Sequence, residues 1–108
     1  MQEERRGEHR VPFDLTVLVW GLDAEGEPFR QEAIARNIST GGALLAGLRQ
    51  PLRSGDFIYV QYGQVRARFH VVWSRECDYG MDVVAAVQRL AGNPCPWQEV
   101  LLSEQQPT

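Results

Sequence analysis

The sequence predicts an all-β domain, a small antiparallel barrel or sandwich of six strands. Apolar and polar residues alternate with a period of two, most cleanly over residues 65–74, as expected for a half-buried strand. Turn residues separate such runs at short, regular intervals, and no strand–helix–strand unit is visible. A length of 108 residues suits one hydrophobic core and is too short for two.

The first half of the chain predicts three strands. Pro12 disfavours helix before it, so the chain should enter the domain extended. Residues 13–22 are rich in β-branched and aromatic side chains and form the first expected strand. The turn-rich stretch 23–28 leads into a second strand at 29–39, and a serine–glycine turn leads into a short apolar strand at 43–48.

The second half predicts three more strands. A turn at 53–56 precedes a fourth strand at 57–62, and Gly63–Gln64 has the glycine-first pattern of a type II′ hairpin. A sixth strand is expected at 79–85. In the fifth strand, alternation predicts that one set of side chains faces the core, namely Val65, Ala67, Phe69, Val71 and Trp73.

The C-terminal part predicts helix. Residues 85–92 are expected to form two helical turns ending at a glycine, and a last helix is expected to begin at Pro96. Trp97, with Val100 and Leu101, should anchor that helix on the barrel. The chain thus divides into a flexible basic arm (1–10), a barrel (11–86) and a short helical extension with a tail (87–108).

The composition excludes several functions. The net charge of −3 argues against binding a nucleic acid polymer, which needs a broad basic face. No apolar run approaches the roughly 20 residues of a membrane span, and the charged N-terminus favours a cytoplasmic location. Cys77 and Cys95 lack metal-type spacing and are expected to be free thiols. No spacing supports a catalytic constellation, so we expect neither enzymatic activity nor a metal or cofactor.

Two short motifs stand out. The first is Arg6-x-x-x-Arg10, which has little value alone because Arg49-x-x-x-Arg53 repeats it by chance. The second is Asn37-x-Ser39-x-x-Gly42 in the stretch RNISTGG. At the residue frequencies of this chain, about 0.02 chance occurrences of the second pattern are expected, so its presence is informative.

The order of these motifs resembles that of the PilZ domain family of cyclic di-GMP receptors. The resemblance covers roughly residues 5–85 and includes the stretches ERRGEHRVPFD, IARNISTGGALL, LRSGDFIYV and VVWSRECDYGMDV. It implies a six-stranded Greek-key β-barrel with an N-terminal arm that closes over a ligand bound at the barrel surface. It also implies the ligand itself, cyclic di-GMP.

The arm supplies the expected cationic contacts. A guanidinium group makes charge-assisted hydrogen bonds to phosphate or to the O6 and N7 edge of guanine, and it stacks on base planes. Arg6 and Arg10 are therefore the leading ligand contacts, and His9 could touch a phosphate. In the family, a basic residue just before the first motif arginine accompanies two intercalated ligand molecules. Arg5 holds that position, so the resemblance favours two molecules over one.

The second motif is expected to read guanine. Asn37 and Ser39 lie two residues apart, so in a strand their side chains share a face. Ile34 and Ile38 alternate to the opposite face, which we assign to the core. A simple Asx-type turn that closes a hairpin is the alternative interpretation of this motif.

Three more residues complete the expected site. Gly41 and Gly42 permit positive φ and close backbone approach, which would let the turn sit against a large ligand. Trp73 aligns with an aromatic residue that lies near the ligand in some PilZ domains, although its alternation places it in the core. Both positions for Trp73 stay open at this point.

The functional hypothesis is a cyclic di-GMP receptor and adaptor, whose ligand-ordered arm alters the surface offered to an unidentified downstream protein. The alternative is a PilZ-like adaptor that acts without a ligand and binds only proteins. Arg66, Arg68 and Arg75 form either a solvated face or part of a partner surface. Oligomeric state and pathway are not indicated by the sequence.

Overall fold

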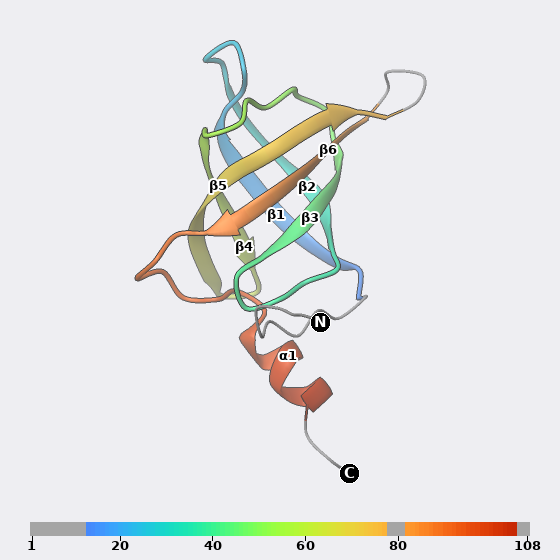
Figure 1. Ribbon diagram of the computed structural model, residues 1–108, viewed down its shortest axis with the longest axis vertical. Coiled ribbons are helices and arrows are strands. Elements are labelled where there is room, and N and C mark those ends of the chain that lie inside the picture. The colour runs from blue at the N-terminus through green and yellow to red at the C-terminus, as the bar shows by residue number, and fades with distance from the viewer. Residues whose placement is uncertain (1–12, 78–81, 106–108) are drawn as a thin grey trace, which may run out of the picture.

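A computed structural model describes residues 13–77 and 82–105 of the chain (Figure 1). It contains six strands and one helix within these ranges; the number of strands and the C-terminal helix are as the sequence predicts. The elements are β1 (Leu15–Leu22), β2 (Pro28–Arg36), β3 (Gly42–Leu48), β4 (Phe57–Tyr62), β5 (Val65–Glu76), β6 (Val83–Arg89) and α1 (Gln98–Gln105).

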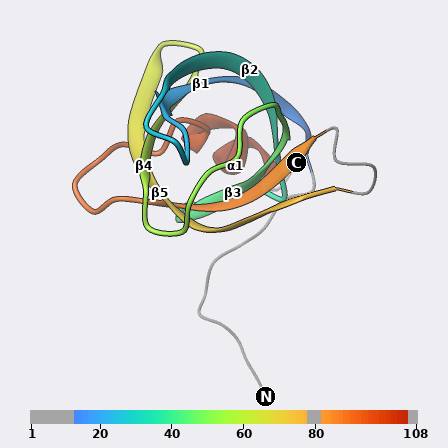
Figure 2. The same cartoon turned by 90° about the horizontal axis from the view of Figure 1, so that it is seen from above.

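The strands close into a barrel in the order β1-β2-β3-β6-β5-β4, and every neighbouring pair is antiparallel (Figure 2). Because β4 returns to lie beside β1, the spatial order β4-β1-β2-β3 is that of a Greek key. This confirms the predicted fold class and settles the choice between a barrel and a sandwich in favour of the barrel.

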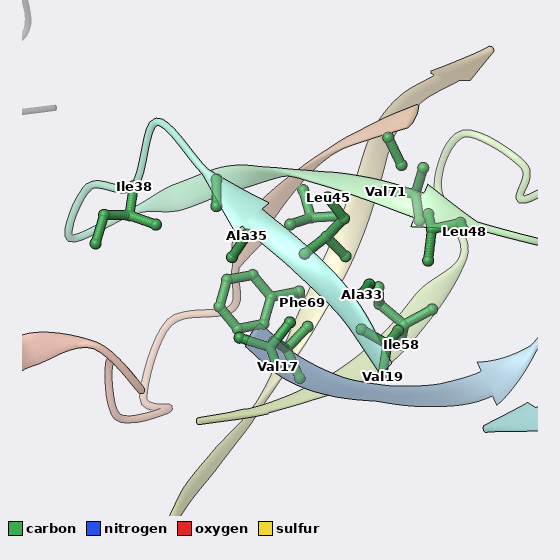
Figure 3. Close-up of a cluster of buried hydrophobic side chains, with 14 of the residues drawn as sticks. Val17, Val19, Ala33, Ala35, Ile38, Leu45, Leu48, Ile58, Phe69 and Val71 are labelled. Carbon is green, nitrogen blue, oxygen red and sulfur yellow. The ribbon is translucent and has the colours of Figure 1, made fainter. Parts of the chain in front are cut away.

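The core lies inside the ring of strands and is made of alternate residues from each strand (Figure 3). Val17 and Val19 of β1 face Phe69 and Val71 of β5, and all four are 2% exposed or less. Helix α1 lies at one end of the barrel (Figure 1), where Trp97 at 0% exposure joins the same cluster. The expected anchoring of the helix by this tryptophan is confirmed.

The hairpin between β4 and β5 has the predicted geometry. Tyr62 pairs with Val65, so the loop has two residues. Gly63 has a φ of 61°, whereas Gln64 is not among the described residues with positive φ. A positive φ at the first loop position alone is the type II′ pattern that the sequence predicts.

The helical turns predicted for residues 85–92 are wrong. These residues begin within β6, which continues to Arg89 and pairs with β3 and β5. Val83, Ala85 and Val87 are all buried, which is the period-two pattern of a strand. Alanine is a good helix former, but the chance to complete the barrel between two strands outweighs this local preference.

Strand β5 is longer than β4, the strand that pairs with it on one side. Its pairing with β4 ends at His70, and beyond that point it pairs only with β6. The loop before β4 covers this second half, because the Ser54 hydroxyl donates a hydrogen bond to the carbonyl of Val72. The Ser74 hydroxyl donates in the opposite direction, to the carbonyl of Leu52.

Both cysteines are free, as predicted, with Cys77 exposed and Cys95 half-buried. Burial raises the pKa of the Cys95 thiol above its ordinary value, so this group stays protonated at neutral pH. Helix α1 is much too short to cross a bilayer, and the described ranges hold no other helix that could do so.

Candidate functional site

The turn between β2 and β3 begins at Asn37, which has a φ of 53°. It is the one non-glycine residue with positive φ in the described ranges. Asparagine adopts this left-handed conformation more readily than most residues do. Strand β2 therefore ends at Arg36, and the prediction that residues 37–39 continue it is wrong.

This break changes which side chains face the core. In β2 the inward residues are Ala33 and Ala35, and Ile34 lies on the outer face at intermediate burial. Ile38 nevertheless enters the core at 0% exposure, because the left-handed residue before it shifts the alternation. The expectation for Ile38 is confirmed, and that for Ile34 is wrong.

Ser39 holds the turn together. Its side chain is 0% exposed, and its Oγ accepts hydrogen bonds from the backbone N–H groups of Gly41 and Gly42, each at 3.2 Å. The backbone N–H of Ser39 also donates to the carbonyl of Gly42 at 2.9 Å. Asn37 is exposed, so the predicted shared outer face of Asn37 and Ser39 is wrong.

Gly42 is needed for close packing rather than for positive φ. Neither Gly41 nor Gly42 is among the described glycines with positive φ, so the turn does not use the positive φ that these glycines permit. A Cβ atom added at Gly42 would lie 2.2 Å from the backbone oxygen of Val87 in β6. At Gly42 the backbone of β3 thus comes close to the backbone of the neighbouring strand β6.

We predict that Gly42→Ala destabilises the protein by about 1–3 kcal/mol, because neither β3 nor β6 can move away cheaply from the new methyl group. Urea unfolding followed by circular dichroism measures the change. Thr40→Ala is the matched control, since this exposed side chain lies in the same turn and its loss should cost less than about 0.5 kcal/mol. Equal stability of Gly42→Ala and the wild type would contradict the packing argument.

Trp73 lies on the outer surface, which decides between the two positions that the sequence left open. The register between β5 and β6 shifts between Val71 and Trp73. At this bulge Val71 faces the core, whereas Val72 and Trp73 are 43% and 39% exposed. One extra residue in a strand re-aims the side chains that follow it. The guanidinium carbon of Arg75 lies 5.2 Å from the centroid of the Trp73 ring.

These features enclose a surface cavity of about 360 Å³ between the turn, the start of β3, the bulge of β5 and β6. This volume lies at the lower end of the range of small-molecule sites, about 300–1,000 Å³. The cavity brings together four of the predicted site residues. The residues around it are Asn37, Gly41, Gly42, Ala43, Leu44, Val72, Trp73, Ala86, Val87 and Gln88.

Two residues that sequence reasoning did not assign to the site support this turn. The Arg89 side chain donates from Nε to the carbonyl of Thr40 at 2.9 Å, and its backbone N–H donates to that of Gly41 at 2.7 Å. Trp97 Nε1 donates to the carbonyl of Ser39 at 2.7 Å. Gln88, which lines the cavity, was also missed, because residues 85–92 were expected to be helical. The strand pattern of Val83, Ala85 and Val87 was the signal that could have placed them.

None of the described residues that line this cavity is charged; the amides of Asn37 and Gln88 are polar groups among them. Nearby, Arg36 forms an exposed ion pair with Asp14, with 3.5 Å between Nε and Oδ1. A polyanionic ligand would thus need cations from outside the lining. The remaining predicted contacts fall outside the described residues; they are Arg5, Arg6, His9 and Arg10.

Comparison with known proteins bears on the fold. No family model matches the chain, and no curated protein matches it. The structure of the Bacillus subtilis inhibitor of motility (MotI/DgrA) is similar, with a TM-score of 0.65 and 16% sequence identity. The likeness covers 94% of this chain and 49% of that chain. The chain therefore shares its fold with a part of MotI/DgrA and spans about half the length of that protein.

Proposed function

We propose that this protein is a PilZ-like receptor for cyclic di-GMP that acts as an adaptor, without catalysing a reaction. The observation that carries the proposal is the cavity in which Asn37, Gly41, Gly42 and Trp73 meet. These residues come from the motif turn and from a bulge about thirty positions away, so their convergence is a property of the fold. The lining contains no carboxylate, imidazole or thiol, which suits binding better than catalysis.

The cavity suits a guanine base. The exposed Trp73 offers a ring face for stacking, and such contacts contribute about 1–3 kcal/mol per base. The amides of Asn37 and Gln88 each supply donors and an acceptor for the edge of a base. Asn37 is exposed at the mouth of the turn, where its left-handed backbone directs the side chain away from the core. Ser39 supports this turn from the buried side through its hydrogen bonds with Gly41 and Gly42.

The phosphates need the arm. Because the cavity lining is uncharged, the two phosphates of cyclic di-GMP would be neutralised by Arg6 and Arg10, with His9 as a further donor. Arg5 favours two intercalated ligand molecules. Binding would thus place the arm over the cavity and alter the surface presented to an unidentified partner protein.

Calorimetric titration of the whole chain with cyclic di-GMP tests the proposal. We expect micromolar affinity, about 8 kcal/mol of binding free energy, with two ligand molecules per chain. Trp73→Ala should weaken binding about tenfold through the lost stacking. Leu102→Ala, an exposed apolar residue on α1, should leave the affinity unchanged. A folded sample that gives no heat would overturn the proposal and favour the adaptor that acts without a ligand.

A further inference from the structure

A second surface of aromatic and arginine side chains crosses the outer face of the barrel. The strand register places one residue from each of four neighbouring strands in a row, because Trp20 of β1 pairs with residues of both β2 and β4. In each strand at least one residue next to the row is buried, so the row faces outward; these buried neighbours include Val19, Gln31, Ile58 and Ala67. In order, it consists of Arg30, Trp20, Tyr59 and Arg68.

The aromatic rings of this surface are held in place. The Trp20 and Tyr59 rings are stacked, with centroids 5.4 Å apart and planes 10° from parallel. Phe57, two residues before Tyr59 on the same face, is 53% exposed, and the guanidinium carbon of Arg68 lies 5.0 Å from the centroid of its ring. Rigid exposed aromatic side chains beside arginine are typical of the centre of a protein interface.

A hollow of about 270 Å³ lies beside this row, lined by Leu18, Trp20, Arg30, Gln61 and Arg66. Two arginines, Arg30 and Arg66, line this hollow beside Trp20. In the described ranges no carboxylate forms an ion pair with Arg30, Arg66 or Arg68. Glu32 is the acidic residue of the same outer face of β2.

The outer surface that carries Arg30, Trp20, Tyr59, Arg66 and Arg68 is called the wall below. It lies across the barrel from the candidate ligand cavity. In the closed order β1-β2-β3-β6-β5-β4, strand β1 is three positions from β6, and β4 is three positions from β3. The cavity uses β3, β6 and the bulged part of β5, whereas the aromatic row is centred on β1 and β4 and reaches β5 only at Arg68. A partner could therefore occupy this wall while the cavity stays open to a ligand.

We propose that this wall binds an acidic segment of a partner protein, in which carboxylates alternate with apolar or aromatic side chains. The carboxylates would form forked hydrogen bonds with Arg30 and Arg66, and the apolar groups would pack on Trp20 and Tyr59. The inference deepens the proposed adaptor role because it assigns a binding surface to the partner. It rests on that role only in assuming that a partner protein exists. A nucleic acid strand suits the wall less, because a polymer of phosphates needs a broad basic face, whereas this small group of arginines has Glu32 on the same side of the barrel.

The test uses the whole chain without nucleotide and a fluorescent acetylated peptide that alternates glutamate with phenylalanine and glycine. We expect saturable binding, measured by fluorescence anisotropy. The affinity should weaken about tenfold when glutamine replaces glutamate in the peptide, and it should also weaken with added salt. The Trp20 indole signal in an NMR titration should move. The double variant Arg30→Ala/Arg66→Ala should lose about tenfold in affinity.

Arg49→Ala/Arg53→Ala, which removes the same charge from the loop between β3 and β4, is the control and should bind the peptide as the wild type does. Unchanged binding by Arg30→Ala/Arg66→Ala, or tighter binding of oligothymidylate than of the peptide, would overturn the inference. Cyclic di-GMP affinity should be unaffected by Arg30→Ala/Arg66→Ala. If the nucleotide fails to bind the wild type, the proposed receptor function is refuted. If the peptide fails to bind, only the proposed role of this wall is refuted.

Discussion

Replacing Arg10 with alanine is expected to weaken cyclic di-GMP binding about ten- to a hundredfold, and Arg6→Ala should act similarly. A hydrogen bond to a charged group contributes about 1.5–3 kcal/mol, and about 1.4 kcal/mol corresponds to a factor of ten. The cavity lining carries no charged side chain that could replace the lost guanidinium. Thermal unfolding should be unchanged, because charged residues before the first strand add nothing to an apolar core. Calorimetry and thermal melts measure the two quantities.

The chain contains its own control for this experiment. Arg49 and Arg53 repeat the spacing of the arm motif in the loop between β3 and β4, away from the cavity. Their joint replacement removes two positive charges and the exposed Arg53–Asp56 ion pair, which contributes little to stability. We expect this variant to retain its affinity. Equal losses from both arginine pairs would point to a general effect of net charge and contradict the arm hypothesis.

Trp97→Ala is expected to destabilise the protein by about 3–5 kcal/mol, a large share of the stability of a small domain. The indole ring is fully buried, and its centroid lies 5.5 Å from that of Phe69. Its Nε1 also donates to the carbonyl of Ser39 at 2.7 Å. Removing the ring leaves a cavity at the end of the barrel and frees the motif turn. Urea unfolding followed by far-UV circular dichroism gives the free energy.

Two further variants separate the contributions of Trp97. Trp97→Phe keeps most of the apolar contact and deletes the hydrogen bond to Ser39, so we expect a smaller loss, part of it the roughly 1 kcal/mol of that bond. Leu102→Ala, on the exposed face of the same helix, should cost less than about 0.5 kcal/mol. If Trp97→Ala were as mild as Leu102→Ala, α1 would have no role in holding the turn.

The strands could be predicted well because their signals are local and repeated. Alternation over residues 65–71 specifies a face with several side chains at once, and Gly63 marks a hairpin whose loop length fixes the register. The motif around Asn37 identified the right neighbourhood, since this turn does line a cavity. The cyclic di-GMP site itself stays a prediction.

The difficulties on β2 and β5 have one common physical cause. Asn37 in the left-handed conformation and the bulge near Val72 each displace the alternation by a single residue, and a shift of one residue turns the side chains beyond it to the other face. Neither event changes composition or periodicity enough to be visible in the sequence. Alternation therefore assigned Ile34 to the core together with Ile38 and left Trp73 between the core and the surface, although the structure places Ile34 and Trp73 on the outside.

Strand β6 was misjudged at its end for a different reason. Ala85 and Ala86 favour helix locally, and only the gap between β3 and β5 makes the extended form better. That gap exists only once the other strands have closed around it. Helix propensity does not register long-range pairing of this kind, and only the period-two pattern of Val83, Ala85 and Val87 indicates it. Gln88 and Arg89, which lie beside the turn, were therefore not expected at the site.

The covered second half of β5 has a consequence for self-association. A strand that projects past its neighbour exposes backbone groups on which a second molecule can add a strand, and such templates lead to aggregates. Here the hydroxyls of Ser54 and Ser74 hold the preceding loop across that stretch. Without these two hydrogen bonds the edge of β5 would expose unpaired backbone groups. A sample that is monomeric in the wild type should therefore begin to form fibrils or precipitate when both serines are replaced.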